Sequence, residues 1–259
     1  MTHRKIYLYD ESSSETLDLS EIARYLEAKL KNVHVNLRPE FINFHSGCTD
    51  DSAKRLVDAR VRDLNNPDLI YEPMHGEIEY EKRMLKDPGK SSIGILYDGL
   101  KVQELYEGLV PVNECNLKNI HIIFTNRLIG TWDDGDLRYH ARVIVCGHPC
   151  MISTSGIVEA PAMPTEFYHL KQQYAMSGMP LDVLKEEFKG RFIDHDDPRL
   201  TEAMKGYVMQ AIFYQLTLEP FCNEKSCRLY NAHFQEEVFH AQFGATEFCE
   251  KHEKMLGGI

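Results

Sequence analysis

The stretch Cys222-Asn-Glu-Lys-Ser-Cys227 is followed, after twenty-one further residues, by Cys249-Glu-Lys-His252. Each segment carries a pair of metal-binding side chains, and the loop between them can fold back to bring the pairs together. Three thiolates and one imidazole would complete a tetrahedral zinc site with no open position, which is typical of a structural ion. The pattern therefore predicts that Cys222, Cys227, Cys249 and His252 bind one Zn²⁺. Ordinary buried or surface cysteines with a chance histidine nearby are the alternative.

Basic side chains lie close to these ligands in the sequence. Lys225, Arg228 and Lys251 are expected to offset the negative charge of the thiolates. The N-terminus has no apolar segment of the signal-peptide type, and no run of about 20 apolar residues could span a bilayer. We therefore expect a cytoplasmic protein without a membrane partner. In such reducing surroundings its seven cysteines serve metal binding or chemistry rather than disulfides.

The overall composition indicates a globular chain. Of its 259 residues, 43% are hydrophobic and 27% are charged, and a chain of this size can bury a core without disulfide support. The formal net charge of -11 repels phosphate backbones, which argues against nucleic acid as a partner. The remaining expectation for a macromolecular partner is a protein or peptide that the sequence does not identify.

Hydrophobic periodicity predicts an N-terminal β-α-β unit. Apolar runs indicate strands at 5–9 and 33–37, and helical spacing indicates a helix over 17–30 between them. The further elements expected before residue 162 are helices at 51–64 and 102–109, a hairpin or surface excursion over 68–92, strands at 93–97, 120–124, 139–145 and 151–154, and a loop at 131–136.

From residue 162 onward the pattern is almost entirely helical. Strands that alternate with helices before a helical C-terminal half predict an α/β fold with a mixed sheet, and α+β is the alternative. We expect an N-terminal β-α-β lobe at 1–90 and a zinc-binding lobe at 91–259, or one compact domain overall. The helices expected in the second half lie at 164–176, 180–189, 198–217, 231–243 and 245–256.

The cysteine-rich stretch resembles archaemetzincins. These proteins carry HExxHxxGxxHC, a second cysteine after four residues, then xM, and later a CxxC pair. Here Cys222 stands at the motif's own cysteine, Cys227 follows after four residues, and Cys249 and His252 stand where CxxC would be. The resemblance covers about residues 90–255 and is closest to archaeal proteins named as metallopeptidases. It implies a metzincin-type, archaemetzincin-like fold around a structural zinc ion.

The chain departs from this family at the catalytic motif. Counted back from Cys222, the three ligand histidines would fall at Ala211, Gln215 and Phe221, and the general-base glutamate at Ile212. None of these side chains supplies the ligands and the base that a catalytic zinc ion needs. We therefore expect a non-peptidase binding or scaffold protein. The alternative is a metallopeptidase or other metallohydrolase with a reorganised active site.

A reorganised metal site would draw on histidines elsewhere in the chain, namely His140, His195, His233 and His240. His233, Glu237 and His240 follow helical spacing and could share one face as metal ligands. A solvated, charged helix face is the alternative interpretation of the same three residues.

Two further polar groupings could bind ligands. Asp194-His-Asp-Asp197 offers carboxylate and imidazole groups, although capping of the following helix is the simpler interpretation. Arg138, His140 and Arg142 alternate onto one face of the strand at 139–145, which could bind a carboxylate or phosphate near Glu159. A solvated strand face is the alternative.

The segment Cys146-Gly-His-Pro-Cys150 carries a second pair of cysteines. A three-residue gap beside a strand can place the two sulfurs near one another, for metal or redox chemistry. Small buried cysteines on either side of a turn are the alternative.

Overall fold

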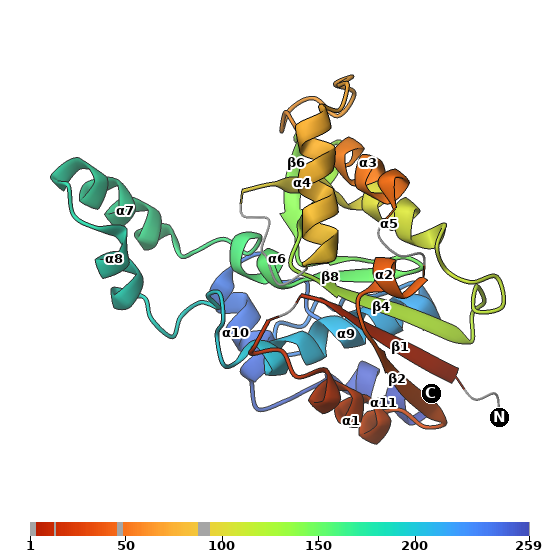
Figure 1. Ribbon diagram of the computed structural model, residues 1–259. Helices are drawn as coiled ribbons and strands as arrows, with labels where there is room; N and C mark the ends of the chain where they lie inside the picture. The colour runs from red at the N-terminus through yellow and green to blue at the C-terminus, as the bar shows by residue number, and fades with distance from the viewer. Residues whose placement is uncertain (1–3, 13, 46–48, 88–93, 259) are drawn as a thin grey trace.

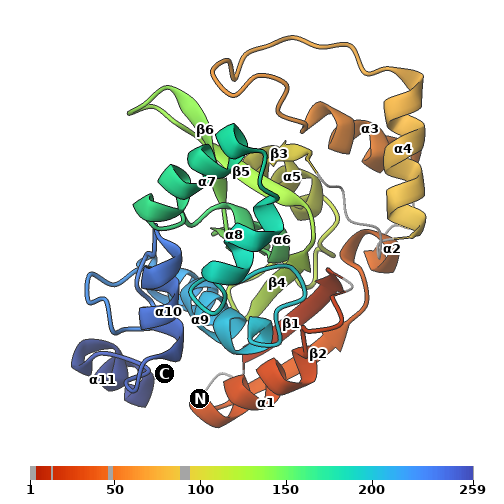
Figure 2. The same cartoon turned by 90° about the vertical axis from the view of Figure 1, so that its left-hand side faces the viewer.

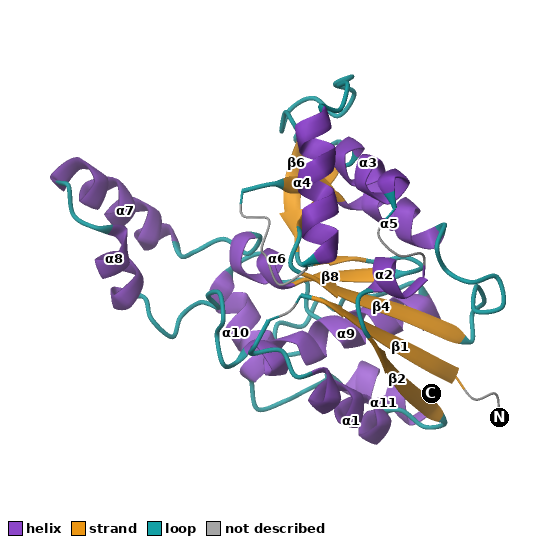
Figure 3. Ribbon diagram, viewed as in Figure 1, coloured by secondary structure: helices purple, strands orange, loops and turns teal. Residues whose placement is uncertain are grey.

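The computed structural model describes residues 4–12, 14–45, 49–87 and 94–258. Its main sheet has five strands in the order β2-β1-β4-β8-β7. The strands β2, β1, β4 and β8 run parallel (Figure 3), and β7 runs antiparallel to β8. Because β1 lies between β2 and β4, the two expected lobes share this sheet. The strands are β1 (Arg4–Glu11), β2 (Val33–Arg38), β4 (Asn119–Thr125), β7 (Ile144–Val145) and β8 (Cys150–Ser153).

A second sheet has three strands in the order β3-β5-β6. They are β3 (Leu96–Asp98), β5 (Leu128–Asp133) and β6 (Arg138–Arg142), and β5 runs parallel to β3 and antiparallel to β6. The loop expected at 131–136 is wrong in its first half. Trp132 pairs with Tyr139 across β5 and β6, and their rings meet edge to face at 5.5 Å.

Helices cover both faces of the main sheet, because each strand alternates its side chains between two cores. In β1, Ile6 and Leu8 enter one core, whereas Tyr7 and Tyr9 enter the other. The expected α/β fold with a mixed sheet and a helical C-terminal half is confirmed (Figure 1). The first core is closed by α1 (Leu19–Lys29), α9 (Leu200–Thr217), α10 (Gln235–Phe243) and α11 (Glu250–Gly258), and the second by α2 (Phe41–His45), α3 (Asp50–Asp58) and α5 (Gly99–Glu107).

Helix α4 (His75–Lys86) lies within the stretch 68–92, so the expected hairpin or surface excursion is wrong over the helix; residues 68–74 do form an exposed loop, and 88–92 lie outside the described residues. One charged side chain of this helix makes a buried contact. Glu81 is fully buried, and it accepts hydrogen bonds from the Tyr97 hydroxyl at 2.8 Å and from Arg60 Nε at 2.9 Å. A buried carboxylate with such partners holds α4 against the second core.

The helix expected at 198–217 is confirmed as α9, in which Ala211 and Ile212 are buried. Before it come α6 (Thr154–Glu159), α7 (Thr165–Ser177) and α8 (Leu181–Glu187). Helices α7 and α8 project from the body as a pair (Figures 1 and 2), and they share a small apolar cluster of Phe167, Leu184 and Phe188. In the described part of the chain, no helix is both long and apolar enough to cross a membrane.

Candidate metal centre and adjoining cleft

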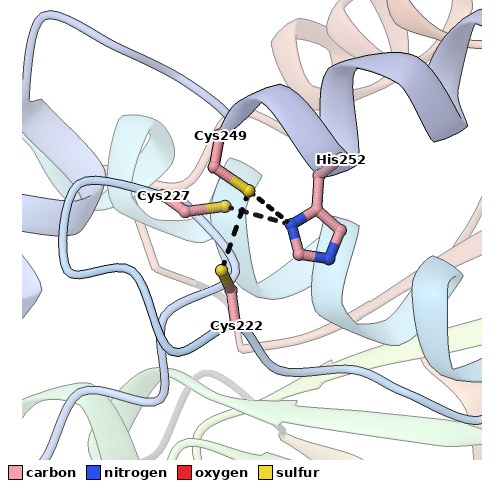
Figure 4. Close-up of side chains that lie close together, drawn as sticks. All are labelled: Cys222, Cys227, Cys249 and His252. Carbon is pink, nitrogen blue, oxygen red and sulfur yellow. Dashed lines mark hydrogen bonds between the residues drawn. The ribbon is translucent and has the colours of Figure 1, made fainter.

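The structure brings the four predicted metal ligands together (Figure 4). Cys222 and Cys227 lie in the segment after α9, Cys249 directly precedes α11, and His252 lies on α11. The sulfurs of Cys222 and Cys249 are 3.9 Å apart, and His252 Nδ1 lies 3.6 Å from Cys227 Sγ and 3.0 Å from Cys249 Sγ. All four side chains are buried.

Two of these three spacings fit a tetrahedral ion, whereas the 3.0 Å between Cys249 Sγ and His252 Nδ1 is shorter than such an ion requires. Bonds of about 2.3 Å to sulfur and about 2.0–2.1 Å to nitrogen place two sulfurs about 3.8 Å apart, and a sulfur and a nitrogen about 3.6 Å apart. The Cys222–Cys249 and Cys227–His252 separations of 3.9 and 3.6 Å lie close to these values. The three cysteines are free of disulfides. The cluster can therefore hold a metal ion, and its identity as one Zn²⁺ stays a prediction.

The backbone around the cysteines prepares the site. The Cys222 N–H donates to the Leu229 carbonyl at 2.8 Å, and the Glu224 N–H donates to Cys222 Sγ at 3.3 Å. Burial raises the pKa of the Cys227 thiol to about 12, so a cation is needed to hold it as a thiolate at neutral pH. The ring of His252 packs edge to face on Phe213 of α9 at 5.2 Å, which joins the cluster to the main core.

The neighbouring basic side chains do not turn to the sulfurs. Lys225 pairs with Glu237 at 3.0 Å, and Lys251 pairs with Glu219 at 3.5 Å. Arg228 is engaged by two carboxylates, those of Glu202 and Glu247. Nearby carboxylates therefore hold these cations, and the expectation that they offset the thiolates stays a prediction.

A cleft of about 770 Å³ lies beside α9. One wall is a continuous run of chain, residues 140–146, which covers the end of β6 and all of β7. The remaining lining comes mainly from α9, from the segment after it and from the segments before α7 and before α10, with one residue each from α5 and β5. It consists of Leu100, Thr131, Ala160, Pro161, Ala162, Tyr207, Gln210, Tyr214, Pro220, Phe221, Asn231, Ala232, His233 and Phe234.

The positions that correspond to the archaemetzincin catalytic motif are used for packing and anchoring. Ala211 and Ile212 are buried in the core. Gln215 donates a hydrogen bond from Nε2 to the Gly147 carbonyl, and Phe221 lines the cleft as a half-exposed side chain. α9 therefore presents no imidazole to the cleft.

The strand residues singled out in the sequence separate in the structure. His140 and Arg142 line the cleft, whereas Arg138 and Glu159 are exposed and do not. His140 Nε2 lies 2.6 Å from Asp136 Oδ2. Arg142 Nε donates to the Thr131 hydroxyl at 2.9 Å.

The residues proposed for a second metal site do not converge. Glu237 pairs with Lys225 and accepts the backbone N–H of His233 at 3.0 Å, while the His240 side chain is exposed. His195 is exposed too. Apart from the cysteine cluster, the described residues offer one further group with metal-ligand spacing, namely Asp133, Asp136 and His140.

The Asp194–Asp197 segment serves the backbone. Asp194 accepts the His195 N–H at 2.9 Å and lies 3.3 Å from Lys185 Nζ. Asp197 accepts the Arg199 N–H at 2.9 Å directly before α9. These carboxylates therefore order the turn before α9 and pair with Arg199 and Lys185, and the expected side-chain cap on α9 is not formed.

Sequence reasoning missed a buried polar cluster on the opposite face of the main sheet. The Tyr9 hydroxyl lies 3.0 Å from His45 Nε2 and 2.9 Å from His121 Nδ1, and it accepts a hydrogen bond from Arg38 at 2.8 Å. Arg38 also forms two hydrogen bonds of 2.7 Å with Glu114. Burial lowers the pKa of His121 to about 4. No local motif reveals this cluster, because its members are far apart in the sequence.

The described residues combine a mixed α/β fold with a buried cysteine–histidine cluster that can hold a metal ion and with a cleft beside the edge strands β6 and β7. The chain belongs to the family described as "Probable metallopeptidase family (DUF6775)", whose model matches residues 2–259. A comparison with curated proteins found no match.

Two solved structures are similar to the chain at low scores. An archaemetzincin from Methanopyrus kandleri has 11% identity and a TM-score of 0.41, over 99% of this chain and 94% of that one. A zinc-dependent peptidase from Methanocorpusculum labreanum strain Z has 11% identity and a TM-score of 0.42, over 97% and 99%. Scores at this level are too low to support conclusions, so the family match alone carries the assignment.

Substitution of Cys227 by serine should release the metal. The variant loses one thiolate of a closed site, and we expect its zinc content, measured by mass spectrometry after purification without chelator, to fall from about one ion per chain to near zero. The loss should destabilise the protein by at least about 3 kcal/mol, or roughly 6–12 °C in melting temperature. Cys115→Ser, at an exposed cysteine outside the cluster, is the control. Unchanged zinc content and melting temperature in Cys227→Ser would refute the assignment.

The buried His121 should make stability depend on pH. The unfolded chain protonates this ring below about pH 6.5, whereas the folded ring stays neutral down to a pKa of about 4. Its contribution is therefore complete above pH 6.5 and is lost as the pH falls towards 4. In urea unfolding at about pH 7 and about pH 4.5, His121→Gln should show a pH-dependent loss smaller than wild type by on the order of 2 kcal/mol.

The matched control is His34→Gln, since the His34 side chain is 70% exposed. This variant should retain the wild-type dependence of the unfolding free energy on pH. The same dependence in wild type and His121→Gln would contradict the prediction.

Proposed function

We propose that the protein binds an extended peptide segment in the cleft beside α9, and that one zinc ion at the cysteine–histidine cluster is structural. In this proposal the protein has no peptidase activity of the HExxH type. The observation that carries the proposal is the continuous run 140–146 along the cleft wall.

This run belongs to two strand edges. β6 is the outer strand of the three-stranded sheet, and β7 is the outer strand of the five-stranded sheet. An edge strand presents backbone N–H and C=O groups to which another extended chain can pair, and pockets beside it can select alternate side chains. A peptide laid along 140–146 would pair with the edge of β6, with that of β7, or with both.

The facing wall of the cleft comes from α9. Tyr207, Gln210 and Tyr214 follow one another at helical spacing and line the cleft together. Gln210 Nε2 donates to the Tyr230 carbonyl at 3.1 Å, which fixes the amide orientation. Its buried Oε1 has no hydrogen-bond partner among the described residues, and it would accept an N–H from a bound peptide.

The charge of the lining indicates the chemistry of the ligand. Among the cleft-lining residues that the structure describes, none is Asp, Glu or Lys, and Arg142 carries the positive charge. The rest of the lining is mostly apolar or aromatic. An apolar peptide fits this lining if its carboxylate replaces that of Asp133, which lies 3.8 Å from Arg142 Nη2, as the ion-pair partner of Arg142.

The absence of the catalytic motif supports binding without hydrolysis. Amide hydrolysis by zinc requires an ion with an open position, an activated water and a base. The full sequence contains no HExxH, and the cysteine cluster offers four ligands, which leaves no open position on a tetrahedral ion. A chelator should therefore affect stability rather than an activity.

The second candidate function is a metallohydrolase with a reorganised metal site. The description of the family as one of probable metallopeptidases favours it. So does the group of Asp133, Asp136 and His140, because His140 also lines the cleft. His233 would be the further imidazole available from the opposite wall.

Peptide binding can be measured by fluorescence anisotropy. The probe is a pool of labelled peptides built from Val, Ile, Thr and Ser, each made with a free and with an amidated carboxyl terminus. We expect free-terminus peptides to bind more tightly, and Arg142→Gln to weaken their binding by about tenfold, or about 1.4 kcal/mol. Arg138→Gln is the matched control, since Arg138 lies on the same strand but outside the cleft. If none of the peptides binds wild type, the proposal is refuted.

Hydrolysis is tested separately on the zinc-loaded protein. With casein and a mixed peptide library, with and without a zinc chelator, we expect no cleavage, because no base and no open metal position of the HExxH type is present. Cleavage that is removed by chelator and by His140→Ala or His233→Ala would instead establish the metallohydrolase.

A further inference from the structure

Cys146 and Cys150 stand opposite one another at the hairpin between β7 and β8. The antiparallel pairing of these strands places Val145 opposite Met151, so the next step of the register places Cys146 opposite Cys150 across the turn at 147–149. Directly opposed residues in such a pair have Cα atoms about 4.5–5.5 Å apart. A disulfide needs a separation of about 4.4–6.8 Å. Both cysteines are free thiols in the structure.

The turn between them is held from both helical layers. Gln103 of α5 donates to the Pro149 carbonyl at 2.8 Å, and Gln215 of α9 donates to the Gly147 carbonyl. The packing on the turn is tight, because a Cβ on Gly147 would lie 2.2 Å from the Gln103 side chain. The two thiols therefore remain facing one another, and a bond between them requires little rearrangement of the backbone.

The two thiols differ in access and acidity. Cys146 is half-buried and lines the cleft, whereas Cys150 is fully buried and donates to the Val145 carbonyl at 3.4 Å. Interaction with the Cys150 thiol lowers the pKa of Cys146, and burial raises the pKa of Cys150. Cys146 is thus the sulfur that a solute in the cleft can reach, and the one that ionises first.

The surroundings favour redox chemistry over metal binding. No third cysteine, histidine or carboxylate among the described residues joins this pair at metal-ligand spacing. We propose that Cys146 and Cys150 form a redox-active dithiol, which reacts with low-molecular-weight disulfides that enter the cleft and closes into a disulfide across the hairpin.

The reaction proceeds by two thiol–disulfide exchanges. The Cys146 thiolate attacks one sulfur of the small disulfide, forms a mixed disulfide and releases one small thiolate. The Cys150 thiol gives its proton to that thiolate, and its sulfur attacks Cys146 Sγ and releases the second small thiolate, which takes up the proton that Cys146 lost on ionisation. The protein dithiol is oxidised by two electrons, and the small disulfide is reduced to two thiols.

Mass spectrometry of tryptic peptides tests the proposal, on the full-length, zinc-loaded protein. The protein is incubated with glutathione disulfide, treated with iodoacetamide and digested with trypsin. The tryptic peptide Val143–Lys171 contains both cysteines and no other. We expect it to appear without alkylation and lighter by two hydrogen atoms than the dithiol form, and to become doubly alkylatable after treatment with dithiothreitol.

Two variants separate the roles of the sulfurs. Cys150→Ala, which removes the resolving thiol, should accumulate glutathione as a mixed disulfide on Cys146. Cys146→Ser should leave the buried Cys150 without glutathione and without an internal bond. Cys115, which is exposed, reports in each sample that glutathione disulfide was reactive.

The proposal is overturned if the wild-type peptide stays doubly alkylatable while Cys115 is modified. It is also overturned if wild type stops at a mixed disulfide on Cys146, since the Cys150 thiol would then not act on it. A mixed disulfide on Cys150 in Cys146→Ser would contradict the order of attack.

Discussion

Burial of α9 on nearly all sides is the constraint on which the rest of the structure depends. The helix packs into the main core through residues such as Met204 and Val208, and it contacts the ring of His252 through Phe213. Its remaining face, with Tyr207 and Tyr214, forms a wall of the cleft. A helix that supports the sheet, the metal centre and the cleft together has little room for ionisable ligands, since a buried charge without a partner is costly. Ala211 and Ile212 accordingly pack in this core and supply neither a metal ligand nor a base.

The fold was largely predictable where its signals are local. Chelating pairs such as Cys222 and Cys227 are only a few residues apart, and the β-α-β opening follows from alternation and helical spacing within short windows. α4 escaped prediction because Glu81 is paired with Arg60 and Tyr97, which are remote in the sequence. From the sequence alone, a charged residue is expected to face solvent unless its distant partner is known.

The candidate site was predictable to a smaller extent, for the same reason. The cysteine cluster was predicted from the spacing of its residues. The cleft is formed mainly by β6, β7, α9 and loop segments that are far apart in the sequence, so no single stretch of sequence predicts it. Arg142 and His140 were singled out from strand alternation, yet only the structure separates them from Arg138. The buried polar cluster around Tyr9 joins residues as distant in the sequence as His121, and no sequence motif contains them together.

The inner position of β1, between β2 and β4, has a consequence for folding. Lys5 pairs with His34 on one side and with Asn119 on the other. The first strand therefore has one neighbour that is close in the sequence and a second that is remote. Closing such a loop is entropically slow, and sheets built from distant parallel strands form slowly as a class. If β1, α1 and β2 pair before β4 joins them, the β4 side of β1 stays an open strand edge, to which another chain can add.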